Sequence, residues 1–221
     1  PEVLAICQEW LDGGHLALKD NTFPQLLLFT ELQHRASEKI YKAIIRGDPR
    51  PKRLVPLINR YNAEPGHTRH VDFDTARPTW ETDPDKCHIS HVVCDTESWE
   101  QKAAQAMEQM DEVLCYVKNH NLGFTIPYTL NGESKRYMPD FIVRIDDGRG
   151  PDDPLNLIVE VSGQQDGKIG QAKATKTDTA RTLWVPAVNN AGQFGRWDFV
   201  EVADPWDLQN LIRAHLGEAA T

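Results

Sequence analysis

Two carboxylates interrupt apolar runs that have the composition of buried strands. Asp140 lies in the run at 137–143, and Glu160 lies in the run at 157–162. An ionised carboxylate inside such a run is costly unless it is paired or binds a cation. Two such oxygen ligands meeting at one place would suit Mg²⁺, which proteins bind through one or two carboxylates plus substrate phosphates. The alternative is that both side chains face water at the ends of their strands.

The strands that carry these carboxylates must bring them together. We expect a strand at 124–130, a hairpin turn at Asn131-Gly132, a returning strand at 135–145 and, after an acidic loop, a strand at 155–161. Asp140 comes early on the returning strand, and Glu160 comes late on the next one. If these two strands are antiparallel, both carboxylates reach the same end of the sheet.

The remaining pattern predicts an α/β fold. Helical spacing marks residues 3–11 and 23–45, and residues 62–90 should be extended. After residue 98 the further expected elements are a helix from Trp99 that Gly123 stops, a helix at 168–181, strands at 183–188 and 197–202, and a final helix opened by Asp204-Pro205. The order α-β-β-β-α-β-β-α predicts a mixed sheet flanked by helices. We therefore expect a mainly helical and extended connector at 1–95 and an α/β domain at 96–221.

An ordered series of motifs resembles a known family. Pro139-Asp140, followed on the next strand by Glu160-Val161-Ser162, resembles the PD-(D/E)XK nuclease superfamily. Over roughly residues 65–215 the chain resembles the C-terminal region of the Res subunit of type III restriction enzymes and related helicase–nucleases. The segments that carry this likeness are 66–75, 87–93, 98–100, 137–141, 159–163 and 184–189.

The resemblance implies hydrolysis of DNA phosphodiester bonds with Mg²⁺, or with Mn²⁺ in its place. Asp140 and Glu160 would be metal ligands, and the backbone carbonyl of Val161 would be a third. Glu100, in the first turn of the helix from Trp99, resembles the extra acidic residue that some members bring to the site. Its alternative is a carboxylate that the helix N-terminus stabilises.

The resemblance also implies a parent protein, binding partners and a cellular compartment. The chain begins with Pro1 rather than Met, and we interpret it as the tail of a longer protein. Its partners would be DNA, an ATP-driven helicase motor in the same parent chain and a modification or specificity subunit. ATP would bind only in that motor. The whole would act in the cytoplasm, in restriction-modification and antiviral defence.

One position departs from the family pattern. The family's lysine belongs two residues after the Glu, where this chain has Ser162. A serine cannot supply the positive charge that orients the nucleophile and stabilises the transition state. On the expected helix at 168–181, Lys176 lies on the apolar stripe and is the first candidate for a migrated lysine, before Lys173 and Lys168. The alternative is that these lysines face solvent and that the nuclease fold is degenerate, kept for DNA binding or assembly.

Composition bears on nucleic-acid binding, on membrane insertion and on the redox compartment. The chain has 221 residues, with 24 Lys and Arg against 33 Asp and Glu. The resulting net charge of −9 argues against nonspecific nucleic-acid binding by the whole chain, although residues 42–60 are locally basic and form either a solvated helix or a phosphate-facing patch. No apolar run could span a membrane. Four cysteines are too few for a disulfide-stapled fold, which favours a reducing cytoplasm.

Overall fold

The computed structural model describes residues 2–14, 23–46, 55–56, 67–94, 99–130, 133–150, 152–161 and 167–219. The expected turn at Asn131-Gly132, the motif position Ser162 and most of the basic stretch at 42–60 lie outside these residues. The chain forms two compact units. One is Pro1–Lys52 with Thr129–Ser134, and the other is Arg53–Tyr128 with Lys135–Thr221.

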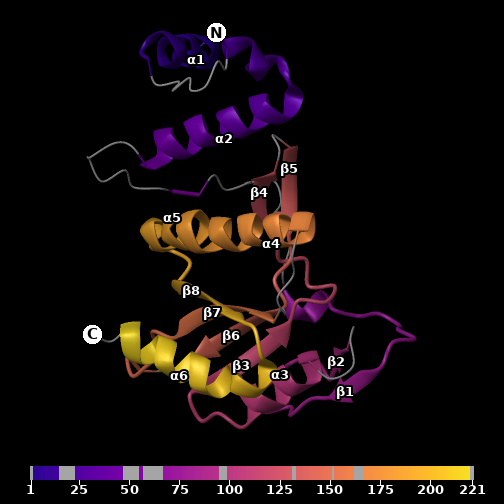
Figure 1. Cartoon of the computed structure of the whole chain (residues 1–221). Coiled ribbons are helices and arrows are strands. Elements are labelled where there is room, and N and C mark those ends of the chain that lie inside the picture. The colour runs from indigo at the N-terminus through magenta and orange to yellow at the C-terminus, as the bar shows by residue number, and fades with distance from the viewer. Residues whose placement is uncertain are drawn as a thin grey trace. The chain divides into compact units, whose positions relative to one another are not determined.

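The smaller unit is mainly helical (Figure 1). Helix α1 (Glu2–Asp12) ends at a glycine pair, in which Gly14 has a φ of +71°. A left-handed glycine of this kind commonly terminates a helix. The 3₁₀ helix η1 (Pro24–Leu28) leads into α2 (Thr30–Arg46) through the extended residue Phe29. Both helices predicted for this part of the chain are therefore confirmed, and Phe29 interrupts the second.

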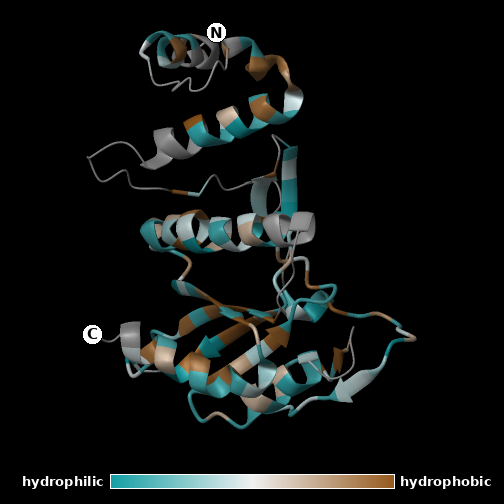
Figure 2. Ribbon diagram, in the orientation of Figure 1, coloured by the Kyte–Doolittle hydropathy of each residue, from teal (hydrophilic) through white to brown (hydrophobic). Residues whose placement is uncertain are grey.

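A four-stranded sheet forms the centre of the larger unit. Strands β3 (Val113–Lys118), β6 (Phe141–Ile145), β7 (Leu155–Val161) and β8 (Arg196–Val202) lie side by side in that order. The first three are antiparallel, and β8 is parallel to β7. The structure thus confirms a mixed α/β architecture, in which apolar residues concentrate on the strands (Figure 2).

Helices cover both faces of this sheet. Leu157 and Val159 of β7 belong to one hydrophobic cluster, together with residues of α3 (Trp99–Glu108) and α6 (Leu208–Ala219). Ile158, between them in sequence, belongs to a second cluster with residues that follow α4 (Gly167–Thr179) in the π-helical turn η3 (Ala180–Trp184) and in α5 (Val185–Ala191). Successive side chains of a strand point to opposite faces, so α3 and α6 cover one face and the helical run from α4 to α5 covers the other. None of the described helices is both long and apolar enough to cross a bilayer.

Residues before the expected domain boundary at 95 pack with the sheet. The short antiparallel strands β1 (Thr79–Glu81) and β2 (His91–Val93) belong to the larger unit, as does the 3₁₀ helix η2 (Thr68–His70). Cys87 forms a parallel bridge with Tyr116 of β3 and is 4% exposed in the cluster beneath α3. These contacts bury apolar side chains of the stretch that we expected to be a connector. The two compact units divide the chain after residues 52, 128 and 134.

The expected returning strand at 135–145 is divided. β5 (Glu133–Tyr137) pairs with β4 (Ile126–Leu130) in a separate two-stranded sheet, whereas β6 belongs to the central sheet. The interruption falls at Met138–Asp140, where Pro139 has no N–H to donate to a strand ladder. Asp140 therefore lies at the entrance of β6 and not within a continuous strand.

Two other predictions were wrong. The helix from Trp99 ends at Glu108 and not near Gly123, because residues 113–118 form β3 and pair with β6. The segment at 183–188 is helical and not a strand, with Pro186 in the first turn of α5. In both segments a short apolar run fits either periodicity, and the tertiary partners decide between them. The strand at 155–161 and the helix opened by the Asp204 cap are confirmed, with Asp204 accepting a hydrogen bond from Trp206 N–H.

Candidate active site

Asp140 and Glu160 lie at the same end of the sheet. β6 and β7 are antiparallel, and Phe141 pairs with Val159. Asp140 directly precedes this pair on one strand, and Glu160 directly follows it on the other. The N–H of Val161 also donates to Asp140 Oδ2 at 2.9 Å. The antiparallel arrangement that the two carboxylates required is therefore present.

Two donors hold the Glu160 carboxylate, which is 4% exposed as a residue. Lys176 Nζ donates to Oε1 at 2.8 Å, and the Tyr137 hydroxyl donates to Oε2 at 2.6 Å. The Lys176 ammonium also lies 4.5 Å from the centre of the Tyr137 ring. A buried carboxylate needs such charge-assisted hydrogen bonds, and here a cation on a helix and a hydroxyl at the end of β5 supply them.

Strand alternation explains why α4 provides that cation. Ile158 packs in the cluster on the α4–α5 side of the sheet. Glu160, two residues later on β7, points to the same side. Lys176 in the last turn of α4 faces the same space, so a lysine distant in sequence reaches the carboxylate.

The other candidate lysines have different positions. Lys173 Nζ lies 2.9 Å from Glu201 Oε1, and Glu201 on β8 is the register partner of Glu160 on β7. Two lysines three residues apart on α4 thus contact two carboxylates that are adjacent across the sheet. Lys168 belongs to α4, but its side chain lies outside the described part of the structure. Of the two described lysines, Lys176 is the one bound to Glu160.

Glu100 pairs with a lysine that the sequence reasoning missed. Its Oε1 atom lies 3.5 Å from Lys118 Nζ, and the two residues are 9% and 8% exposed. Neither Glu100 Oε2 nor Lys118 Nζ has a hydrogen-bond partner among the described residues. Lys118 was overlooked because we expected residues 99–122 to form one helix. As part of β3, two residues after the core residue Tyr116, Lys118 instead points toward α3.

Asn119 fixes the backbone around Asp140. Its N–H donates to the Asp140 carbonyl at 2.8 Å, and its Nδ2 donates to the carbonyls of Pro139 and Phe124 at 3.0 and 2.8 Å. The bonds to Asp140 and Pro139 hold the short segment between β5 and β6 against the end of β3, and the bond to Phe124 holds the segment that precedes β4. Asn119 was also missed, since its role depends entirely on the pairing of β3 with β6.

The site has an unusual charge balance. Burial, and then the negative charge of Glu160, raise the pKa of Asp140 to about 6, while the Val161 N–H and the Lys118 ammonium act in the opposite direction. Burial and the neighbouring Glu160 also raise the pKa of Tyr137 well above its ordinary value. Tyr137 therefore stays a hydrogen-bond donor at neutral pH, and the Asp140 carboxyl changes charge near the physiological range.

The donor set fits a hard divalent cation. The carboxylates of Asp140 and Glu160 and the Val161 carbonyl are oxygen ligands of the kind that Mg²⁺ prefers, and the unpaired Glu100 Oε2 is a fourth buried acceptor near Asp140. Within the described ranges, no group of three or more His, Cys, Asp or Glu side chains is arranged to hold a metal ion by itself. Mg²⁺ rarely has such a protein cage, because it retains several waters and binds substrate phosphates.

Comparisons with known proteins identified no relative. Family models, curated proteins and solved structures each gave no match to this chain. The site is therefore defined by its own geometry, namely two carboxylates at the ends of paired strands and a lysine from the following helix.

Proposed function

We propose that this chain is a metal-dependent endonuclease domain that hydrolyses DNA phosphodiester bonds. The proposal includes a PD-(D/E)XK-type fold and a parent protein, an ATP-dependent restriction or defence helicase–nuclease similar to the Res subunits. The observation that carries it is the 2.8 Å contact of Lys176 with Glu160 beside Asp140. This contact supplies the cation that Ser162 cannot supply. Between α3 and α4 the chain forms β3 to β7, of which β3, β6 and β7 are antiparallel neighbours, and this arrangement supports the helix-meander-helix unit that the resemblance implies.

Each residue has a chemical role in this proposal. Asp140, Glu160 and the Val161 carbonyl would hold Mg²⁺ or Mn²⁺, which when bound supplies charge neutralisation at the phosphate and a more acidic water. Lys176 would donate from its ammonium group to the attacking water or to a non-bridging phosphate oxygen. Tyr137 orients Glu160 through its hydroxyl, and Asn119 positions the backbone of Asp140.

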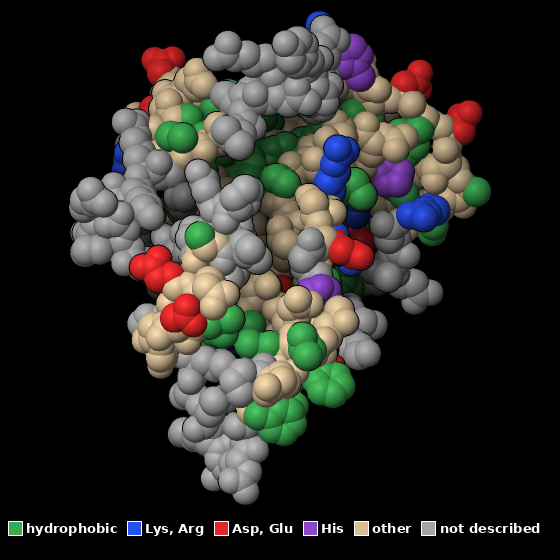
Figure 3. Space-filling model, turned by 90° about the horizontal axis from the view of Figure 1, so that it is seen from above, with side chains coloured by type: hydrophobic (Ala, Val, Ile, Leu, Met, Phe, Trp, Pro, Cys, Tyr) green, Lys and Arg blue, Asp and Glu red, His purple; other side chains and the backbone are tan. Residues whose placement is uncertain are grey.

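A second function is favoured by one observation. Ser162 stands at the motif lysine position, and a nuclease fold without a competent cation would serve only for DNA binding or assembly. The surface seen in Figure 3 carries basic side chains in small groups separated by acidic and apolar ones. Among the described side chains on that face there is no continuous basic track for a nucleic-acid backbone, which counts against the alternative.

The test is nicking of supercoiled plasmid in the presence of Mg²⁺ or Mn²⁺. The 221-residue chain and the longer parent protein that the proposal implies should both be assayed, each as wild type, Asp140→Ala and Lys176→Ala. Lys102→Ala is the matched lysine control, because Lys102 is a half-buried residue of α3 whose ammonium group lies 3.5 Å from the centre of the Trp206 ring. We expect cleavage by wild type and the control, and its loss in both site variants.

One result would contradict the endonuclease proposal. If the parent protein hydrolyses ATP and binds DNA but neither wild type nor Asp140→Ala nicks it, the endonuclease proposal is wrong. DNA binding that both site variants retain would then support the assembly role.

A further inference from the structure

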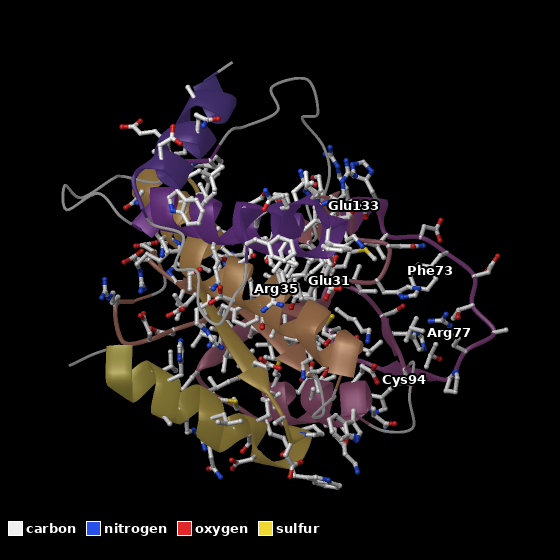
Figure 4. All side chains as sticks on the ribbon, turned by 45° about the horizontal axis from the view of Figure 1, so that its top comes forward. Glu31, Arg35, Phe73, Arg77, Cys94 and Glu133 are labelled. Atoms are coloured by element: carbon white, nitrogen blue, oxygen red, sulfur yellow. The ribbon has the colours of Figure 1, made fainter. Side chains whose placement is uncertain are left out.

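Glu100 and Lys118 form a buried ion pair on the α3 side of the candidate active site. Lys118 Nζ lies 3.5 Å from Glu100 Oε1, and the two residues are 8% and 9% exposed. Apolar side chains adjoin Lys118, among them Val92 and, from the segment at 71–76, Phe73 (Figure 4). A buried ammonium group is costly without a counter-ion, and Glu100 provides one.

This ion pair acts on Asp140. Lys118 of β3 is the register partner of Phe141, which directly follows Asp140. The Lys118 ammonium lowers the pKa of Asp140 and the Glu100 carboxylate raises it, so both charges lie within electrostatic range of that carboxyl. The ammonium group therefore stands beside the proposed metal ligands, on the opposite face of the sheet from Lys176.

The charges around the candidate site are nearly balanced by lysines. Within the described part of the chain, three carboxylates each pair with one ammonium group, namely Glu100 with Lys118, Glu160 with Lys176 and Glu201 with Lys173. Asp140 instead accepts a hydrogen bond from the Val161 N–H. The three pairs leave one formal negative charge, that of Asp140, which a single divalent cation is enough to neutralise.

A second divalent cation would need Glu100 as a ligand. Nucleases that use two metal ions hold them about 3.5–4 Å apart, and Glu100 is the carboxylate on the α3 side that acts on Asp140. That carboxylate already adjoins the Lys118 ammonium. Because like charges repel strongly in a buried site, a metal ion on Glu100 would be opposed by an ammonium group that is enclosed by the protein.

We infer that Lys118 takes the place of a second metal ion, so that the site binds one divalent cation. This inference rests on the proposed nuclease function and specifies its metal centre. Lys118 is a positioning residue, and Glu100 is its counter-ion and not a metal ligand. The rival interpretation is direct binding of a metal ion to Glu100 Oε2, an atom that has no hydrogen-bond partner among the described residues.

Mn²⁺ binding to the full chain tests the inference without DNA and without cleavage. Electron paramagnetic resonance of free Mn²⁺ gives the number of bound ions and their dissociation constants. Because a protein with a net charge of −9 also attracts cations to its surface, the ions of the site are counted as the difference between the wild type and Asp140→Asn. We expect this difference to be one ion per chain.

Replacement of the ion pair by two apolar residues isolates the role of Glu100. Glu100→Leu leaves the Lys118 ammonium without its counter-ion near the metal ligands and should weaken Mn²⁺ binding by about tenfold or more. Adding Lys118→Met removes the second charge and should restore the dissociation constant to within about threefold of the wild type, because no ligand has been lost. Buried ion pairs often tolerate such a replacement without loss of stability, and a melting curve checks the fold.

A matched control removes one carboxylate elsewhere. Glu112→Gln breaks the ion pair with Arg213 beside the other end of β3 and changes the net charge of the chain by the same amount as Glu100→Leu. It should leave the number of bound ions and the dissociation constant of the site unchanged. The ion count of the wild type against Asp140→Asn requires none of the variants of the ion pair.

Two outcomes overturn the inference. One is the loss of two ions in Asp140→Asn, and the other is a double variant that binds Mn²⁺ as weakly as Glu100→Leu does. Either result would make Glu100 a metal ligand and leave the nuclease proposal intact. If Asp140→Asn instead binds as many ions as the wild type, the proposed metal centre itself is wrong, and the nuclease proposal is refuted together with the inference.

Discussion

Lys176 on α4 and Glu160 on β7 form a direct contact of 2.8 Å between Nζ and Oε1, although sixteen residues separate them in sequence. The lysine side chain is 26% exposed and the carboxylate side chain 5%. The ion pair thus has a buried acid and a cation that borders solvent. Under the proposed nuclease function, a substrate phosphate would approach this cation from the open side, whereas the acid would keep its position.

The first prediction separates the two lysines of α4. Lys176→Ala should lower the single-turnover cleavage rate by on the order of a hundredfold, because it removes a donor to the developing charge. Lys173→Ala should have a much smaller effect, since Lys173 pairs with Glu201 and not with Glu160. Rates measured with saturating Mg²⁺ on supercoiled plasmid check this. Equal losses in the two variants would contradict the assignment of Lys176.

The second prediction concerns pH. Asp140 has a pKa of about 6 because of burial and the charge of Glu160, and a cation binds its ionised form. Cleavage at limiting Mg²⁺ should therefore rise with pH through a midpoint near 6. Higher Mg²⁺ should shift that midpoint downward, because the cation competes with the proton. A midpoint that does not respond to Mg²⁺ would exclude Asp140 as the titrating ligand.

The third prediction is a gain in stability at the expense of function. The pKa of Asp140 is raised in the folded protein, so its carboxyl favours folding below the unfolded pKa and loses this contribution as pH rises through about 6. Asp140→Asn removes the charge but keeps an acceptor for Val161 N–H. It should therefore raise the melting temperature at neutral pH.

Mg²⁺ provides the control for that variant. At about a hundred times its dissociation constant, Mg²⁺ should stabilise the wild type by about 2.7 kcal/mol and leave Asp140→Asn unchanged. Thermal unfolding with and without the metal measures both effects. If Mg²⁺ stabilised the wild type and Asp140→Asn equally, the cation would not bind at Asp140.

The fourth prediction concerns the support of Glu160. Tyr137→Phe removes the hydroxyl that donates to Oε2 at 2.6 Å and leaves a buried carboxylate oxygen without that donor. The free energy of unfolding should fall by about 1–3 kcal/mol, as measured by urea denaturation. Tyr128→Phe is the matched control, because the Tyr128 side chain is only half-buried on β4. If the free energy of unfolding falls equally in both variants, the hydrogen bond from Tyr137 to Glu160 does not stabilise the protein more than an ordinary tyrosine hydroxyl does.

The sequence by itself identified the charged residues that meet at the candidate site. Asp140 and Glu160 were identifiable because charged residues in apolar strand patterns are costly without a partner. Lys176 was identifiable because helical spacing placed it on the apolar side of its helix. The strand at 155–161 was also predictable, because this apolar run is enriched in the β-branched residues Ile and Val and lies between Pro154 and Gly163.

Only the tertiary structure decided which residues surround that chemistry. From the sequence alone, residues 113–118 fit a helical stripe, but in the structure they pair with β6. That pairing brings Lys118 to Glu100 and Asn119 to Asp140. The sequence likewise predicts a strand at 183–188, whereas in the structure these residues continue the helical run from α4. Short apolar runs carry no period long enough to distinguish the two conformations, so the hydrogen-bonding partner, which is distant in sequence, determines the conformation and the direction of each side chain.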